Sequence, residues 1–89
     1  MKKRTTLEYL ELAETMGVNP EESYLIALLD KIDGALEDSS TPPDRRVRLM
    51  VKKAQLRVDL EELRNNPNKK PLVCAAALAN KVEEDFKRI

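Results

Sequence analysis

Apolar residues recur at helical spacing along most of the chain, and nowhere do they alternate over the length of a strand. Residues three and four apart share one face of a helix, so this spacing predicts amphipathic helices and no sheet. Capping residues, glycine and proline divide the pattern into helices at residues 5–16, 20–38, 42–65 and 71–88. The predicted fold is therefore all-α: a single helical domain, residues 1–89, built as a small antiparallel bundle of four helices.

The third predicted helix carries apolar residues on two opposite faces. At about 100° per residue, its valine face holds Val47, Met50, Val51, Ala54 and Val58. Its leucine face, on the opposite side, holds Leu49, Leu56, Leu60 and Leu63. A surface helix usually has one apolar stripe, whereas a helix with two is packed on both sides. We therefore expect a long central helix, sandwiched within the fold or between this chain and a partner.

The leucine face is predicted to be the interaction surface. The helices at 20–38 and 71–88 have clear apolar stripes that can cover the valine face, which leaves only the diffuse apolar positions of the first helix for the leucines. An uncovered row of leucines would form a patch of the kind that marks an interface. A two-fold homodimer is the simplest way to bury it. The predicted partner-binding residues are Leu49, Leu56, Leu60, Leu63, Arg45, Arg48 and Lys52.

Composition limits the chemistry that the chain can support. The 89 residues include no histidine and one cysteine, so Cys74 has neither a disulfide partner nor the usual base that activates a catalytic thiol. No phosphate-binding loop, nucleophile elbow or metal-ligand spacing is present in the sequence. We expect a protein that is not an enzyme, with no catalytic residue, cofactor, metal or small-molecule substrate.

Charge is unevenly distributed although the net charge is zero. Through Ser40 there are nine acidic and four basic residues, and from Thr41 onward twelve basic and seven acidic. Complementary halves favour packing of the acidic helix at 20–38 against the basic first half of the helix at 42–65. The alternative is an external acidic partner for the basic half.

The sequence predicts a cytoplasmic protein with no membrane partner. Its longest apolar run, residues 72–79, is far shorter than the roughly 20 residues that a membrane span needs. The basic start at residues 1–4 is followed by glutamates instead of the apolar region of a signal peptide.

The segment LAETMGVN, residues 12–19, resembles the first helix and turn of bacterial and phage helix-turn-helix repressors. Ala13 and the glycine four residues later, Gly17, followed by Val18, match the pattern that allows close helix packing and the turn in that family. The resemblance implies a DNA-binding transcriptional regulator that uses residues 7–29.

Nucleic acid is nevertheless a disfavoured partner. Ser23 stands where the family usually places a buried aliphatic residue, and the carboxylates of Glu21 and Glu22 would repel phosphates. The basic cluster from Arg45 to Arg57 is split into two rows that flank the apolar faces. Such rows are typical of a packed helix, because the stems of the side chains cover apolar surface while their charged ends remain in water.

From Leu28 onward the chain is similar to small four-helix bacteriocin immunity proteins. The similarity rests on a helix that ends near Leu63, an Asn-Pro loop, and Pro71-Leu72-Val73 followed by Asn80, without the aromatic residues of that family. The combined prediction is a small non-enzymatic protein–protein interaction module of adaptor, chaperone-like or inhibitor/immunity type that acts through its third helix. The alternative is the helix-turn-helix DNA-binding regulator.

Overall fold

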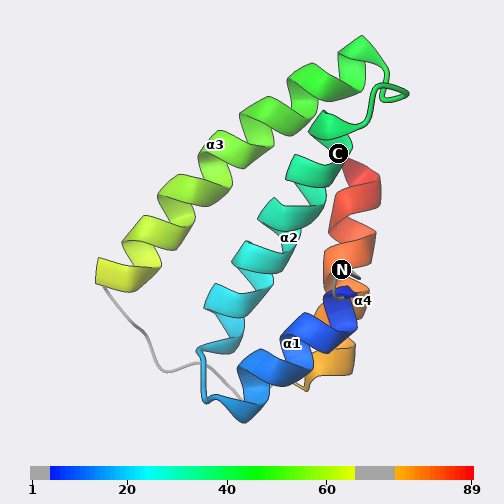
Figure 1. The fold of residues 1–89 in the computed structure, drawn as a ribbon. Helices are drawn as coiled ribbons and strands as arrows, with labels where there is room; N and C mark the ends of the chain where they lie inside the picture. The colour runs from blue at the N-terminus through cyan, green and yellow to red at the C-terminus, as the bar shows by residue number, and fades with distance from the viewer. Residues whose placement is uncertain (1–4, 66–73) are drawn as a thin grey trace.

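The computed structural model describes residues 5–65 and 74–89, which form four helices and no strand (Figure 1). The helices are α1 (Thr6–Thr15), α2 (Pro20–Glu37), α3 (Pro43–Asn65) and α4 (Ala75–Arg88). The predicted all-α bundle of four helices is confirmed. Among these helices, none combines the length and the apolar character that crossing a membrane requires.

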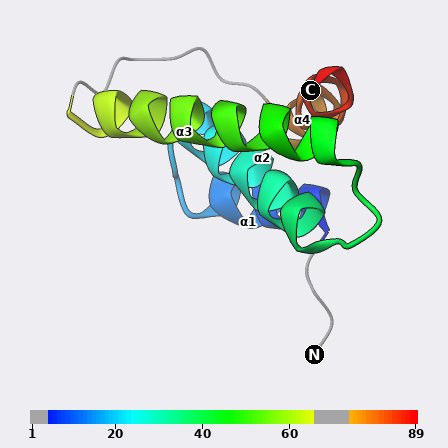
Figure 2. The same ribbon diagram turned by 90° about the horizontal axis from the view of Figure 1, so that it is seen from above.

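α2 occupies the centre of the bundle. α3 packs antiparallel along one side of α2, and α1 and α4 pack on its other sides and on each other (Figures 1 and 2). α3 is long and apolar on two faces, as predicted, but it lies at the edge of the bundle because α2 alone packs along it.

Local capping chemistry sets the boundary between α1 and α2. The Thr5 hydroxyl accepts a hydrogen bond from the Glu8 backbone N–H at 3.2 Å, which caps the start of α1. The Asn19 side chain does the same for α2, accepting from the Glu21 N–H at 2.9 Å. Between them Gly17 has a φ of +75°, the left-handed conformation that commonly ends a helix. These ends agree with the sequence prediction.

α4 begins at Ala75, and Cys74, which the sequence placed within the helix, is in extended conformation before it. The Cys74 side chain makes no capping bond, and the Ala75 N–H instead donates to a carboxylate oxygen of Glu14 at 2.9 Å. A side chain of α1 thus caps the start of α4. The predicted helix start at Pro71 and the predicted core residue Leu72 lie outside the described residues.

The core is aliphatic and is centred on α2. Its buried apolar residues are Leu25, Ala27, Leu28 and Ile32 from α2, Leu10 from α1, Leu49 and Leu56 from α3, and Ala75, Leu78 and Val82 from α4. Along α2 only Asp30 and Glu37 are exposed. Burial of this apolar surface is the main favourable contribution to folding.

The leucine face of α3 belongs to this core. Leu49 is completely buried and Leu56 is 3% exposed, while Leu60 and Leu63 are half-buried against the same cluster. The prediction that this face is uncovered is wrong, and so is the prediction that other helices cover the valine face. Leucine carries more apolar surface than valine or alanine, so burying this face contributes more free energy.

The guanidinium of Arg46 joins the start of α3 to the end of α2. It donates to the carbonyl oxygens of Leu36 at 2.8 Å, Asp38 at 2.5 Å and Thr41 at 3.2 Å. The Thr41 hydroxyl adds a bond to the Ala35 carbonyl at 2.7 Å. The last carbonyls of a helix lack intrahelical partners, and the bond to Leu36 satisfies one of them, while the bonds to Asp38 and Thr41 fix the connection between the two helices.

The neighbouring Arg45 makes a similar contact with the end of α4. Its guanidinium donates to the Phe86 carbonyl oxygen at 3.3 Å and lies 5.0 Å from the centre of the Phe86 ring. Basic residues at the start of α3 are unfavourable for its own dipole, but here they lie against the negative ends of two other helices. These contacts account for the two arginines at the start of α3.

Acidic side chains of α2 pair with basic side chains of α3. Lys53 and Asp33 form an ion pair at 2.5 Å, and Arg64 pairs with Glu22 at 2.9 Å. The predicted packing of the acidic helix against the basic half of α3 is confirmed by the first pair. Such partly exposed pairs contribute at most about 1 kcal/mol each, so they align the two helices more than they stabilise them.

We predict that Arg46→Ala lowers the free energy of unfolding by about 1–2 kcal/mol, because it removes three charge-assisted hydrogen bonds from partly buried carbonyls. Arg48→Ala is the matched control, since Arg48 is exposed two residues further along the same helix and its loss should change stability by less than about 0.5 kcal/mol. Urea denaturation of both variants measures the difference. Equal stabilities would contradict the capping role of Arg46.

Candidate protein-interaction surface

The valine face of α3 is exposed to solvent. Val47 is 62% exposed, Met50 60%, Val51 64% and Val58 54%, and Ala54 among them is also exposed. Figure 2 shows α3 at the edge of the bundle, with α2 and α1 on one side of it and α4 beside its first turns. Because the valine face is directed away from the bundle, we call these five residues the outer face of α3 from here on.

The outer face is continuous. Each of its residues lies three or four positions from another, and the stripe from Val47 to Val58 runs for about 16 Å along the helix. Exposed apolar residues that occur singly are ordinary, whereas a contiguous stripe marks an interaction site. Three of the five residues are valines, which lower helix propensity by about 0.5 kcal/mol each relative to alanine.

A basic groove borders the outer face where α3 passes the end of α4. Its apolar lining comes from Val47, Val51 and Ile89. Its basic lining comes from Arg48, Lys52 and Arg88. The groove has a volume of about 540 Å³ and opens to solvent beside the outer face. It can therefore accept an apolar group flanked by acidic side chains.

The acidic side chain in this groove is already engaged. Asp85 accepts a hydrogen bond from the hydroxyl of Tyr24, whose ring lies 4.8 Å from the Lys81 ammonium. Partial burial, with the hydrogen bond and the nearby charge of Asp85, raises the pKa of Tyr24 far above its ordinary value. Tyr24 therefore stays protonated and holds Asp85 in place, which leaves the groove with a basic character.

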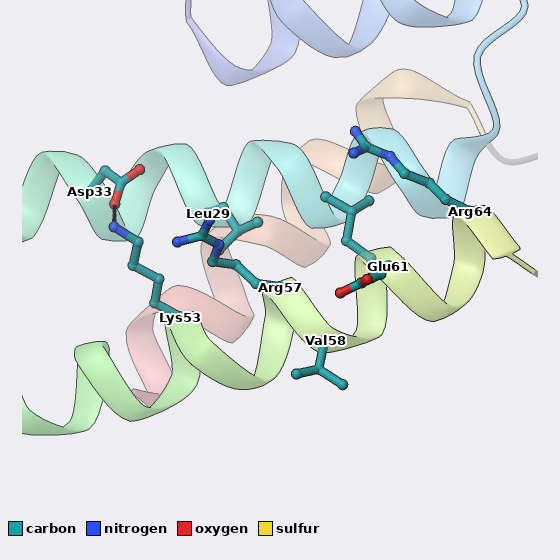
Figure 3. Close-up of a pocket in the computed structure, with 8 residues that line it drawn as sticks. Leu29, Asp33, Lys53, Arg57, Val58, Glu61 and Arg64 are labelled. Carbon is teal, nitrogen blue, oxygen red and sulfur yellow. Dashed lines mark ion pairs between the residues drawn. The ribbon is translucent and has the colours of Figure 1, made fainter.

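A second groove lies on the other side of α3, between α3 and α2 (Figure 3). In Figure 3 Lys53 reaches across to Asp33, and Val58 points away from α2. Arg57 and Glu61 also line this groove. Its walls therefore include the Lys53–Asp33 ion pair, which joins the two helices, and Val58, which belongs to the outer face.

The structure separates the residues that the sequence assigned to partner binding. Four of them, the leucines of the leucine face, are turned toward α2. Arg45 is directed to the end of α4 by its contacts with Phe86. Arg48 and Lys52 line the basic groove and remain beside the exposed surface. The sequence predicted the leucine face to be exposed and missed the exposure of the outer face, although the same helical spacing identified it as one of two apolar faces.

The segment that resembles a helix-turn-helix in sequence forms α1, a turn at Gly17 and α2. A recognition helix needs an open face to enter the major groove. α2 exposes only Asp30 and Glu37, both acidic, along its length. Ser23 is buried, with its hydroxyl donating to the Pro20 carbonyl at 3.0 Å. This packing gives no support to DNA binding through α2.

Within residues 5–65 and 74–89, no three side chains of His, Cys, Asp or Glu form a group that could hold a metal ion. Cys74 is exposed at the start of α4. No protein-family model matches the chain, and neither the curated proteins nor the solved structures contain a significant match. The function is therefore inferred from the geometry of this chain alone.

We predict that shortening a side chain lowers the free energy of unfolding strongly on the leucine face of α3 and hardly at all on the outer face. Leu56→Ala should lower the free energy of unfolding by about 2–5 kcal/mol, because it leaves a cavity in the core. Val51→Ala should change it by less than about 0.5 kcal/mol, because the side chain is exposed and alanine favours helix. Chemical denaturation at low protein concentration measures both. A larger loss for Val51→Ala would contradict the assignment of the faces.

Proposed function

We propose that the protein is a small non-enzymatic protein–protein interaction module that binds through the outer face of α3. The observation that carries this proposal is the row of four large apolar side chains, each more than half exposed, along one helix. The same helix is fixed to the bundle by its opposite face. A surface of this kind serves adaptor, chaperone-like and inhibitor proteins alike.

The outer face is preorganised for binding. Leu49 and Leu56 are buried against α2, and the bonds from Arg46 fix the start of the helix. A partner therefore meets a helix that is already ordered, and binding avoids the entropy cost of folding a flexible segment. Such a stripe suits an amphipathic helix of the partner, which packs its own apolar residues at intervals of three and four.

The borders of the outer face define the chemistry of the partner. Arg48 and Lys52 border the first half of the stripe, so acidic side chains of a partner are favoured there. The apolar centre supplies affinity that changes little with salt, unlike contacts with nucleic-acid phosphates. The partner is another protein or a second copy of this chain. The cytoplasmic location expected from the sequence stays a prediction.

A photo-cross-linking residue at position Val51 tests this proposal in a native lysate. We expect discrete cross-linked products from Val51 and none from the same residue at position Glu84, which is exposed on α4. Adding Met50→Asp and Val58→Asp should abolish the products, because charged side chains interrupt the stripe. The proposal fails if the products from Val51 persist in that variant or equal those from Glu84. Circular dichroism of each variant checks that the helices remain folded.

A further inference from the structure

We propose that the partner of the outer face is a second copy of this chain, with the two α3 helices antiparallel about a two-fold axis near residues 53–55. This inference rests on the proposed function and identifies its partner. The observation that carries it is the arrangement of charge along α3, which is opposite at the two ends of the outer face.

The border of the outer face changes sign along the helix. Arg48 is exposed beside the first part of the stripe, and Lys52 lies in the basic groove there. Beyond the stripe the exposed side chains include Asp59, Glu61 and Glu62. Asp44 is the one acidic side chain at the opposite end of α3, in the first turn, where it faces the positive end of the helix dipole.

A two-fold axis perpendicular to α3 reverses the direction of the second helix. The basic first half of each α3 then lies beside the acidic last part of the other, and apolar residues meet along the centre. A parallel arrangement would place the two basic first halves of α3 beside each other, which is unfavourable. Two-fold interfaces repeat every contact, so each complementary charge contact occurs twice.

The basic groove completes the site for the second helix. Helical spacing places Arg48, Asp59 and Glu62 on the same border of α3. In the antiparallel pair, Asp59 and Glu62 of the second copy therefore approach Arg48 and the Arg88 side chain from α4, which lines the same groove. Val47, Val51 and Ile89 supply the apolar floor beneath that end of the helix.

Arg48 and Glu62 cannot interact within one chain. They are 14 positions apart on a continuous helix, which separates them by about 21 Å along its axis. Asp59 is 11 positions from Arg48, or about 16 Å away. Any energetic coupling between Arg48 and these acids therefore arises from a contact between two chains. Charge reversal at these positions thus tests the antiparallel pairing of the two α3 helices directly.

Sedimentation of the full chain tests the proposal. The average mass of the wild type should rise with concentration from the 10.2 kDa of one chain toward twice that value. Arg48→Glu and the pair Asp59→Lys with Glu62→Lys should each weaken self-association about tenfold or more at low salt, because two symmetric contacts are lost. An equimolar mixture of the two reversed chains should restore association, since every contact in the mixed dimer is again between opposite charges.

Glu84→Lys on α4 is the control and should leave self-association unchanged. A wild type that remains at the mass of one chain up to about 1 mM overturns the dimer. Reversed chains that associate as the wild type does overturn the antiparallel arrangement. If the wild type is monomeric while the cross-linked products from Val51 depend on the outer face, the module binds a different protein. In that outcome the proposed function stands and the self-association is wrong.

Discussion

The fold depends on the packing of α3 along α2, which fixes both the rotation and the direction of α3. Leu49 and Leu56 bury one face of α3 in the aliphatic core, and Arg46 satisfies carbonyls at the end of α2. Neither contact survives a rotation of α3 that would turn the valines inward. The exposed outer face is thus a consequence of the contacts that hold the helix.

The helix boundaries could be predicted from the sequence because they are set by local chemistry. Thr5 and Asn19 cap their helices through bonds to residues two or three positions away, and Gly17 adopts the left-handed conformation expected at a helix end. The choice between the two faces of α3 could not be predicted in this way. Periodicity places residues on faces, but contacts distant in the sequence, such as those of Arg46 with Leu36 and Asp38, decide which face turns inward.

The candidate site, too, could be predicted from the sequence only where it depends on residues close together in the chain. The sequence indicated that α3 carries the interaction surface and that Arg48 and Lys52 lie beside it, and both residues line the basic groove. It assigned the apolar part of the site to the leucines, which α2 covers. The contribution of Ile89 and Arg88 to the groove depends on the position of α4 relative to α3, which no local pattern in the sequence encodes.

The outer face is exposed in one chain, and in the proposed dimer the second copy covers it. The most direct measurement is the rate of thiol labelling of single cysteines in a Cys74→Ser background. Val51→Cys should react rapidly at about 1 μM protein and more slowly at about 1 mM, whereas Leu56→Cys should react slowly at both concentrations. Slow labelling of Val51→Cys at the lower concentration, or equally rapid labelling of Leu56→Cys, would contradict the account.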